Sequence, residues 1–354
     1  MKTYIIAEIG INHNGDIENC YKMINTAAAA GCDAVKFQLF RAKNLYPKSA
    51  GMLDWLDEHK AYSYDIYSSV EKSEMPEGWI DKLMVYCAEK KIDFLASVFD
   101  KEGCDFLSAH GFKTAKLASY VATNIPLIEY CAKRGLSIIL STGGATLGEV
   151  FEAAETVLKY HNKLALLHCS IQYPTQLKDC NLGVIETYRK AFPCIDIGYS
   201  DHTKEVSEAA VQAVYLGARI IEKHITLNKD MTGPDHFFAL EPHELAKMVA
   251  DIRKAEGDCE KKDFCIDEVI YGSSEKKIYS HEKHLRDFAF MRLYSGRDIC
   301  PGDLISANDI NILRSGKKEH GLEPKFIKFF DKYKITAKKN IKFEDPITWD
   351  CILG

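Results

Sequence analysis

The feature of this chain that most constrains its fold is an alternation between short apolar or β-branched runs and longer amphipathic runs, from residue 4 to about residue 256. This alternation is typical of repeated βα units. The runs expected to form strands are residues 4–7, 34–38, 93–98, 114–117, 137–141, 164–169, 194–200 and 220–226. Eight parallel strands that are each followed by a helix close into a barrel. We therefore predict an α/β fold, a (β/α)8 TIM barrel.

Amphipathic runs with helical spacing separate these strands, and one further run follows the last strand. They span residues 21–30, 77–90, 125–134, 147–160, 181–192, 205–216 and 241–256. A long insertion, residues 41–76, follows the second strand and is rich in Tyr, Ser and Asp. Long segments of this kind in compact domains are commonly functional lids, so we expect the insertion to be an irregular cover.

The pattern changes twice after the barrel. Residues 257–287 are polar and charged, which indicates a linker arm. Residues 288–354 consist of short runs broken by turns, which favours a small, mostly β or irregular domain, called the C-terminal module below. A domain of this size has a marginal core, so we expect it to dock against another surface. The predicted division is thus 1–256, 257–287 and 288–354.

Composition narrows the range of partners. Lys and Arg total 46 against 51 Asp and Glu, a net charge of -5, so the chain has no overall basic field for nucleic acid or an anionic membrane. The apolar start is interrupted by Glu8, too early for a signal peptide, and no apolar stretch approaches the roughly 18 residues of a membrane helix. The twelve cysteines are scattered without a CxxC pair. Reduced thiols, and hence a cytoplasmic protein, fit this pattern best.

Polar side chains lie at the carboxyl end of each predicted strand. In strand order they are Glu8; Lys36 and Gln38; Ser97; Lys116 and Ser119; Ser141; His168 with nearby Tyr173; Ser200 and His202; and Glu222 and His224. Catalytic groups of a barrel come from these ends, whereas apolar layers fill its interior. Because the carboxyl ends of parallel strands meet at one rim, we expect these residues to form one site.

Two of these strands place charged residues where they would point into the barrel. Residues two apart on a strand share a face, so Lys36 lies beside Gln38 and Glu222 beside His224. Burying such charges costs several kcal/mol unless each has a partner or a ligand. One alternative is that Lys36 and Glu222 form a salt bridge with each other across the barrel mouth.

His202 and His224 end neighbouring predicted strands, so their imidazoles can converge on a metal ion. Two neutral nitrogens with oxygen ligands suit Mn2+, Co2+, Mg2+ or Zn2+. For either histidine alone, a hydrogen-bonded structural role is the alternative.

A small polyanion is the ligand that the remaining residues suit. Lys36 and Lys116 can neutralise it, and Ser97, Ser119, Ser141 and Ser200 can donate hydrogen bonds to it. Gly143 and Gly144 precede a predicted helix and offer backbone N–H groups for a phosphate. The alternative is that these serines cap the following helices.

Eight motifs in order resemble the sialic acid synthase family, over nearly the whole chain. They are AEIGINHNG (7–15), VKFQ (35–38), KLAS (116–119), ILSTGG (139–144), LLHCSIQYPT (166–175), GYSDHT (198–203), EKHITL (222–227) and GPDHFFALEP (233–242). This resemblance implies a transferase that condenses phosphoenolpyruvate with N-acetylmannosamine or a related amino sugar, giving a nonulosonic acid and phosphate. Residues 288–354 resemble the family's C-terminal domain, which is similar to type III antifreeze protein and is called the SAF domain.

The resemblance also implies residue roles. Phosphoenolpyruvate would contact Lys36, Ser97, Lys116, Ser119, Ser141 and Ser200, and the sugar would contact Glu8, Gln38, Tyr173, Asp235, Phe288 and Arg314. A divalent metal, Mn2+ first and Mg2+ or Co2+ next, would bind His202 and His224. Glu8, Glu222, His202 and Lys116 would be catalytic, with either glutamate handling the proton. The family's domain-swapped homodimer would bring Phe288 and Arg314 to the partner chain's site.

Some positions depart from the family's pattern and bear on the sugar. Ile171 stands where an amide or hydroxyl residue is usual, and residues 237–240 read FFAL in place of smaller residues. An apolar pocket of this kind favours a deoxygenated diacetamido sugar, as in legionaminic or pseudaminic acid synthesis. From a different class of function, a non-catalytic saccharide-binding barrel is an alternative.

Overall fold

The predicted barrel is confirmed. The protein is described here by a computed structural model that covers residues 2–56, 61–261 and 264–353. Its strands are β1 (Tyr4–Gly10), β2 (Ala34–Leu39), β5 (Asp93–Val98), β6 (Thr114–Leu117), β7 (Ser137–Ser141), β8 (Leu164–His168), β9 (Asp196–Asp201) and β10 (Ile220–His224). They close in the order β1-β10-β9-β8-β7-β6-β5-β2, and neighbouring strands run parallel.

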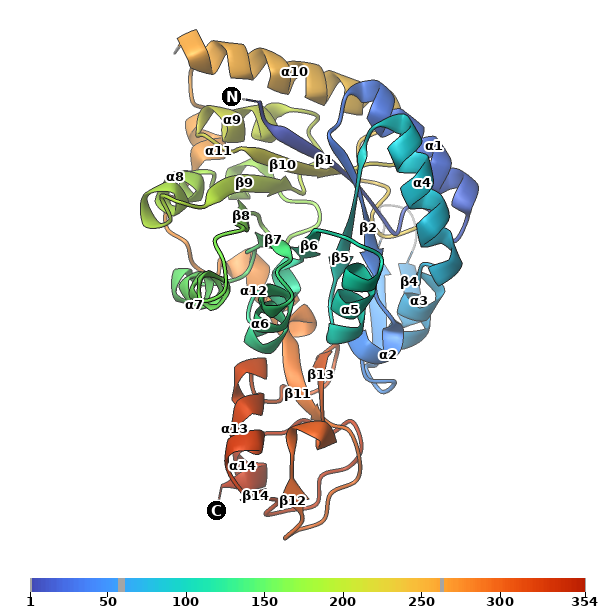
Figure 1. Cartoon of the computed structure of the whole chain (residues 1–354), viewed down its shortest axis with the longest axis vertical. Coiled ribbons are helices and arrows are strands. Elements are labelled where there is room, and N and C mark those ends of the chain that lie inside the picture. The colour runs from blue at the N-terminus through green and yellow to red at the C-terminus, as the bar shows by residue number, and fades with distance from the viewer. Residues whose placement is uncertain (1, 57–60, 262–263, 354) are drawn as a thin grey trace.

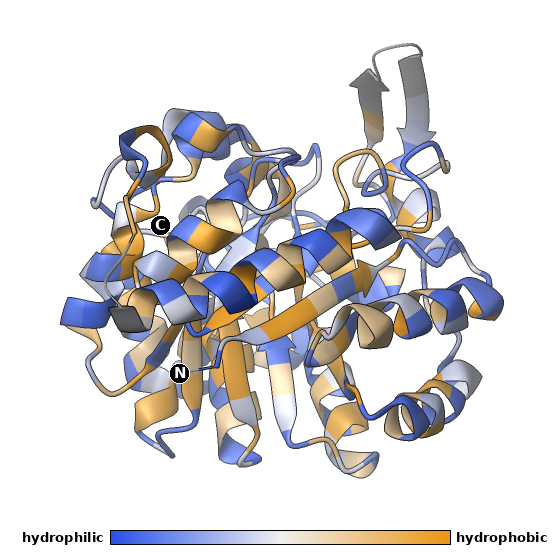
Figure 2. Cartoon of the chain, turned by 90° about the horizontal axis from the view of Figure 1, so that it is seen from above, coloured by the Kyte–Doolittle hydropathy of each residue, from blue (hydrophilic) through white to orange (hydrophobic). Residues whose placement is uncertain are grey.

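Amphipathic helices surround this barrel (Figure 1). They are α1 (Ile17–Ala30), α4 (Ile80–Lys90), α5 (Lys101–Ala109), α6 (Ile125–Lys133), α7 (Leu147–Leu158), α8 (Gly183–Ala191), α9 (Glu208–Tyr215) and α10 (Pro242–Lys261). Helix α5 is absent from the predicted helices because it is short and contains Gly103, with only Cys104 and Leu107 buried. Figure 2 shows the strands mostly hydrophobic and the helices two-coloured, as expected of helices that pack one face on a barrel.

The barrel interior changes character along its axis. A layer of apolar side chains that includes Ile6, Leu95, Ile139, Leu167 and Ile220 fills one end. Strand register then aligns the polar residues at the other end: Glu8 lies opposite both Lys36 and His224, Ser97 opposite Lys116, and Glu222 opposite Ser200. The strand pairing thus brings the predicted rim residues to one level.

In its described parts, residues 41–56 and 61–76, the insertion contains regular secondary structure, which corrects the prediction of an irregular cover. It contains α2 (Ala42–Leu45), β3 (Met52–Leu56), β4 (Ala61–Asp65) and α3 (Ile66–Lys72), and η1 (Glu77–Trp79) follows it. Strands β3 and β4 pair antiparallel as a hairpin, whose residues 57–60 lie outside the described range. The hairpin escaped prediction because the sequence between MLDWL and AYSYD contains neither the Gly nor the Asn that marks a tight hairpin turn.

The arm at residues 257–287 is not a free linker in the part that the structure describes, which omits residues 262–263. Helix α10 continues past residue 256 to Lys261, α11 covers Glu268–Tyr271, and α12 covers Ser280–Ala289 and so passes the predicted boundary. The arm contacts the barrel repeatedly: the Leu182 amide donates to the Ile270 carbonyl and the Leu147 amide to the Lys276 carbonyl. The exact domain boundaries stay predictions.

The C-terminal module is small and rich in short strands, as predicted. Strand β11 (Met291–Ser295) pairs antiparallel with β13 (Ile310–Arg314), and β12 (Leu304–Ile305) pairs with β14 (Ile335–Thr336). Its helices are α13 (Ile327–Lys332) and α14 (Trp349–Ile352). Besides η1, the described residues form the 3-10 turns η2 (Ser119–Val121), η3 (Leu177–Asp179), η4 (Ala307–Asp309) and η5 (Pro324–Phe326). The module has its own apolar cluster and lies against the barrel near α2, α6 and α12 (Figure 1). Among the described residues, no helix has the length and apolarity to span a membrane.

Candidate active site

Four buried charged side chains form the deepest part of the site, which we call the ionic floor: Glu8, Lys36, Lys116 and Glu222. Each is at most 4% exposed. The Nζ of Lys36 lies 2.5 Å from Glu8 Oε2 and 3.7 Å from Glu222 Oε1, and the Nζ of Lys116 lies 3.5 Å from Glu222 Oε2. The alternative of a Lys36–Glu222 salt bridge is therefore confirmed. It is part of a larger, charge-balanced cluster rather than an isolated pair.

Three of the predicted serines contact these charges. Lys36 donates to Ser97 Oγ at 3.0 Å, Lys116 donates to Ser141 Oγ at 2.8 Å, and Ser200 Oγ donates to Glu222 Oε1 at 3.0 Å. The helices α5 and α7, which follow Ser97 and Ser141, are capped by the side chains of Asp100 and Thr146, and α9, which follows Ser200, has no side-chain cap. The serines thus belong to the ionic floor, and the capping alternative is wrong for them.

The loop after β7 corrects one prediction. The amides of Gly143 and Gly144 are not free for a phosphate, because Gly143 N–H donates to Ser119 Oγ at 2.9 Å and Gly144 N–H donates to Glu282 Oε1 at 2.9 Å. Ser119 Oγ also lies 3.0 Å from the thiol of Cys169. Ser119 is therefore held at the rim by this loop, while its predicted role towards an anion stays a prediction.

His202 and His224 converge as predicted. Their ring centroids are 5.6 Å apart, and both rings are buried at the end where the ionic floor lies. The Nδ1 of His202 lies 2.7 Å from the Ser170 carbonyl, which leaves Nε2 for a ligand, and the buried Nδ1 of His224 has no hydrogen-bond partner. Burial lowers the pKa of His202 to about 4 and lowers the pKa of His224 as well. Both imidazoles are therefore neutral at pH 7, the form that binds a metal.

These two histidines fit a metal as a pair. In the described parts of the chain, no group of three or more His, Cys, Asp or Glu side chains has the geometry to hold an ion. A metal here would take two imidazole nitrogens from the protein and its other ligands from water or substrate. The orphaned Nδ1 of His224 is the structural feature that calls for such a partner.

The two glutamates of the ionic floor differ in their affinity for a proton. Burial raises the pKa of Glu8, and Lys36 offsets only part of that effect. Burial also raises the pKa of Glu222, but Lys116 and Lys36 outweigh it and hold this pKa below its usual value. Two carboxyl groups with opposite shifts are the usual sign of an acid and a base at one site.

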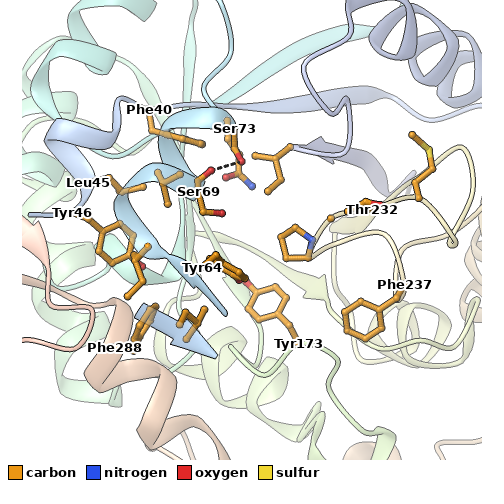
Figure 3. Close-up of a pocket in the computed structure, with 18 of the residues that line it drawn as sticks. Phe40, Leu45, Tyr46, Tyr64, Ser69, Ser73, Tyr173, Thr232, Phe237 and Phe288 are labelled. Atoms are coloured by element: carbon orange, nitrogen blue, oxygen red, sulfur yellow. Dashed lines mark hydrogen bonds between the residues drawn. The ribbon is translucent and has the colours of Figure 1, made fainter. Parts of the chain in front are cut away.

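A cavity of about 930 Å³, which we call the mouth pocket, lies above the ionic floor. Gln38 and Tyr173 line this pocket and contact the residues beneath it. The amide of Gln38 donates to Glu8 Oε1 at 3.0 Å, and the ring of Tyr173 lies 4.2 Å from that of His202. The other walls are mostly apolar or aromatic, and Figure 3 shows Tyr46, Tyr64, Phe237 and Phe288 around the same space.

Four of the six predicted sugar residues, Gln38, Tyr173, Phe288 and Arg314, line this pocket, whereas Glu8 belongs to the ionic floor and Asp235 lies beside His224. Phe288, on α12, and Arg314, on β13, both line the pocket. Asp235 Oδ2 lies 3.9 Å from His224 Nδ1, and burial raises the pKa of Asp235 to about 7. Ile171, which stands where the family's pattern has an amide or hydroxyl residue, is fully buried, and its Cδ1 would lie 2.6 Å from a Cβ on Gly144. It packs beneath the loop and does not line the pocket.

Sequence reasoning missed several residues here. Leu53, Tyr64, Ile66 and Val70 bring the insertion into the wall of the pocket, and the tyrosine content of the insertion was the signal for this role. The rings of Tyr46, Phe99 and Tyr120 surround the guanidinium of Arg314. Glu282, which holds the loop after β7, carries no signal, because a single glutamate in a charged segment reads as solvated.

Comparisons with known proteins agree with the eight sequence motifs that resemble the sialic acid synthase family. A model of the NeuB family matches residues 23–263. The spore coat polysaccharide biosynthesis protein SpsE of Bacillus subtilis is 38% identical over 352 residues, 99% of this chain and 93% of that protein. The crystal structure of that SpsE protein superposes on this chain with a TM-score of 0.89. The superposition covers 100% of this chain and 96% of the SpsE chain.

Two further relatives carry names of synthases. An N,N'-diacetyllegionaminic acid synthase of Campylobacter jejuni is 41% identical, over 88% of this chain and 90% of that protein. The crystal structure of the N-acetylneuraminic acid (sialic acid) synthetase of Leptospira borgpetersenii in complex with citrate is 34% identical, with a TM-score of 0.65 over 73% of this chain and 85% of that one. The chain therefore belongs to the NeuB family, the sialic acid synthase family that its eight motifs indicate.

Proposed function

We propose that this nonulosonic acid synthase condenses phosphoenolpyruvate with an N-acetylated amino sugar and releases phosphate. The observation that carries the proposal is the position of the ionic floor, with two lysines, directly behind Gln38 and Tyr173 of a pocket of about 930 Å³. A barrel that only bound saccharide would gain nothing from burying four charges whose desolvation is costly.

Phosphoenolpyruvate is the substrate that the lysines and serines would hold. Lys36 and Lys116 already contact Ser97 and Ser141, so ammonium and hydroxyl donors converge on one volume. Such preorganised donors hold the enol phosphate and stabilise the charge that moves onto the leaving phosphate. Because both lysine charges are balanced by glutamates, binding of a polyanion favours protonation of one carboxylate. Its raised pKa makes Glu8 the proton carrier, whereas Glu222 stays ionised and holds the two lysines.

A divalent metal would bind between His202 and His224, through the Nε2 of His202 that the Ser170 carbonyl leaves free. A bound Mn2+, Mg2+ or Co2+ would supply Lewis-acid polarisation of the sugar aldehyde. Tyr173, which packs on His202, orients that end of the sugar, and Gln38 and Asp235 provide its polar contacts.

The walls of the mouth pocket favour a deoxygenated diacetamido sugar. Leu53, Ile66, Val70, Met231 and Phe237 line the pocket with hydrocarbon. A methyl group in place of a hydroxymethyl, and an acetamido group in place of a hydroxyl, match such walls, whereas each buried hydroxyl of N-acetylmannosamine would need a hydrogen-bond partner.

A panel of sugars tests both parts of the proposal. The full chain with Mn2+ and phosphoenolpyruvate is offered N-acetylmannosamine, its 6-phosphate or a 2,4-diacetamido-2,4,6-trideoxyhexose, and inorganic phosphate is measured. We expect the diacetamido sugar to give the highest kcat/KM. Faster turnover of N-acetylmannosamine contradicts the sugar assignment alone, and no phosphate with any sugar from folded, metal-loaded protein contradicts the enzymatic proposal. The SAF identity of the C-terminal module, the homodimer and the cytoplasmic location stay predictions.

A further inference from the structure

We propose that the thiol of Cys169 is a positioning residue for Ser119: it donates a hydrogen bond to the serine hydroxyl, so that the serine's own proton is left for the phosphate of phosphoenolpyruvate. This inference rests on the proposed function for its ligand, whereas the hydrogen bond between the two side chains can be tested without any ligand. Among the twelve cysteines, for which the sequence predicts only reduced thiols, Cys169 thereby gains a role in substrate binding.

Three neighbouring strands of the barrel bring the groups together. Ser119 follows β6, Gly143 follows β7 and Cys169 follows β8, and these strands are adjacent in the barrel. The Sγ of Cys169 lies 3.0 Å from Ser119 Oγ, and the Gly143 amide donates to the same oxygen at 2.9 Å. Ser119 is 4% exposed and Cys169 is 1% exposed. The three groups therefore form a contact at the barrel mouth that is shielded from bulk water.

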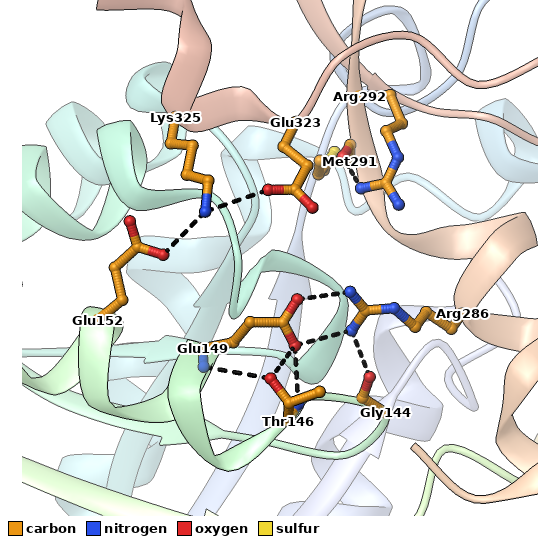
Figure 4. A network of polar contacts seen from close by, with 9 residues as sticks. All are labelled: Gly144, Thr146, Glu149, Glu152, Arg286, Met291, Arg292, Glu323 and Lys325. Atoms are coloured by element: carbon orange, nitrogen blue, oxygen red, sulfur yellow. Dashed lines mark hydrogen bonds and ion pairs between the residues drawn. The ribbon is translucent and has the colours of Figure 1, made fainter. Parts of the chain in front are cut away.

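The loop after β7 gives this contact little freedom. A Cβ on Gly143 would lie 2.8 Å from Cys169 Sγ and 3.0 Å from the Cys169 carbonyl oxygen, so a side chain at this position would displace the thiol. The next residue, Gly144, accepts a hydrogen bond from Arg286 through its carbonyl, and Arg286 pairs with Glu149 at 2.6 Å, as Figure 4 shows. The Gly143 amide and the thiol are thus held in position around the serine oxygen.

The numbers of donors and acceptors assign the direction of the hydrogen bond. A serine hydroxyl has one proton and two lone pairs, whereas a neutral thiol has one proton and a sulfur that accepts weakly. The Gly143 amide takes one lone pair of Ser119. Within the described residues, Ser119 Oγ is the one hydrogen-bond partner of the Cys169 thiol. When the thiol donates, the better acceptor is filled and the serine proton is free for a phosphate oxygen, whereas the reverse direction would use that proton on sulfur.

The thiol carries its proton at neutral pH. Burial raises the pKa of Cys169, and the hydrogen bond with Ser119 and the ammonium groups of Lys276 and Lys116 offset only part of this effect. A neutral thiol can donate and a thiolate cannot, so this protonation state suits a group that donates to Ser119. Because Lys116 belongs to the ionic floor, the thiol also lies near a cation that is proposed to hold the phosphate.

Two other serines that are proposed to hold the phosphate show the same arrangement. Ser97 accepts from Lys36 at 3.0 Å and Ser141 accepts from Lys116 at 2.8 Å, so each keeps its own proton for a ligand. Ser119 has no lysine partner in the part of the chain that the structure describes, and the amide and the thiol surround its oxygen instead. The thiol thus does for Ser119 what a lysine does for the other two serines, without adding a charge.

Infrared spectroscopy of the S–H stretching band tests this hydrogen bond in the ligand-free protein. The difference between the spectra of wild type and Cys169→Ala isolates the Cys169 band from the bands of the other cysteines. A thiol that donates a hydrogen bond absorbs at lower frequency than a free thiol. We expect the band to move to higher frequency when the same difference is taken in a Ser119→Ala background, which removes the acceptor. A band at the same frequency in both backgrounds overturns the proposal.

Calorimetric binding of phosphoenolpyruvate to the full chain tests the consequence. Cys169→Ala should raise the Kd about two- to fivefold, the range of a weak hydrogen bond, and Cys169→Ser, which keeps a donor, should stay within about twofold of wild type. In the Ser119→Ala background, Cys169→Ala should cause no further rise, because the group that it positions is absent. An equal rise in both backgrounds indicates a packing role, and an unchanged Kd in Cys169→Ala indicates no role. Either result overturns the proposal.

Cys20→Ala is the matched control, because it removes a fully buried thiol on α1, and it should leave the Kd unchanged. A similar rise in Cys20→Ala would mean that the loss of any buried thiol weakens binding, which also overturns the proposal. The failure of the proposed function gives a different result. If wild type binds no phosphoenolpyruvate, the proposed function is contradicted and the role of Cys169 towards this ligand with it. If wild type and Cys169→Ala bind it equally, only the positioning role is contradicted.

Discussion

Removing the carboxylate of Glu282 is expected to loosen two loops at the barrel mouth at once. Glu282 Oε1 accepts from the amides of Gly144 and Ile171, and Oε2 accepts from the amide of Tyr279. The Gly144 loop also carries Gly143, whose amide holds Ser119. In Glu282→Ala these amides lose their acceptor inside a site that excludes water. In Glu282→Gln, Oε1 remains for the two loops, and only the contact with Tyr279 becomes donor against donor.

The size of the effect follows from these bonds. A hydrogen bond to a charged group contributes about 1.5–3 kcal/mol, so three such bonds of full strength would contribute about 4.5–9 kcal/mol. The Tyr279 bond lies at a half-exposed helix start and contributes least. We expect Glu282→Ala to lower the free energy of unfolding by about 4 kcal/mol and Glu282→Gln by about 1–2 kcal/mol.

Urea unfolding tests the predicted loss of unfolding free energy, and amide hydrogen exchange tests the predicted loosening of the two loops. The peptides that contain Gly144 and Ile171 should exchange faster in Glu282→Ala, and the KM for phosphoenolpyruvate should rise more than that for the sugar. Glu275→Ala is the matched control, since Glu275 lies on the same segment and is exposed. The reasoning is refuted if Glu282→Ala unfolds at the wild-type urea concentration and its Gly144 and Ile171 amides exchange at the wild-type rate.

Three further predictions concern the metal site and the docking of the C-terminal module. His224→Ala should abolish Mn2+-dependent phosphate release and Mn2+ binding in calorimetry while the circular dichroism spectrum is retained; unchanged binding would remove the metal assignment. Because burial lowers the pKa of His202 to about 4, Mn2+ affinity should stay constant from pH 7 to about 5 and fall as the pH approaches 4, and a loss centred on pH 6.5 would contradict this. The hydrogen bond from Lys328 lowers the pKa of Glu129 from 4.5 to about 2, so its stabilising effect is present above about pH 4.5 and is lost as the pH falls towards 2. The difference in unfolding free energy between wild type and Glu129→Gln should shrink over that range, and a constant difference would refute the pairing.

The barrel could be predicted from the sequence because its signal is local and repeated. A short apolar run with a polar end is the pattern expected of a strand whose two faces are buried. Eight such runs in parallel, each followed by a helix, form a closed barrel. Helix α5 and the β3–β4 hairpin escaped because their segments carry few buried residues or no distinctive turn. Tertiary contacts, rather than local propensity, stabilise such elements.

The sequence alone also determined which residues lie at the rim, because parallel strands bring their carboxyl ends to one edge. These residues include Glu8, Lys36, Lys116, Glu222 and the two histidines, each at or near the carboxyl end of a predicted strand. Only the tertiary structure decided which partners those groups have. Gly144 and Glu282 are 138 residues apart, and no local sequence pattern indicates that the Gly144 amide donates a hydrogen bond to the Glu282 carboxylate. The same holds for Arg314, whose place among the rings of Tyr46, Phe99 and Tyr120 depends on contacts between segments far apart in the sequence. Hydrogen bonds and packing between distant segments are set by the whole fold, because their energy exists only after the chain has brought them together.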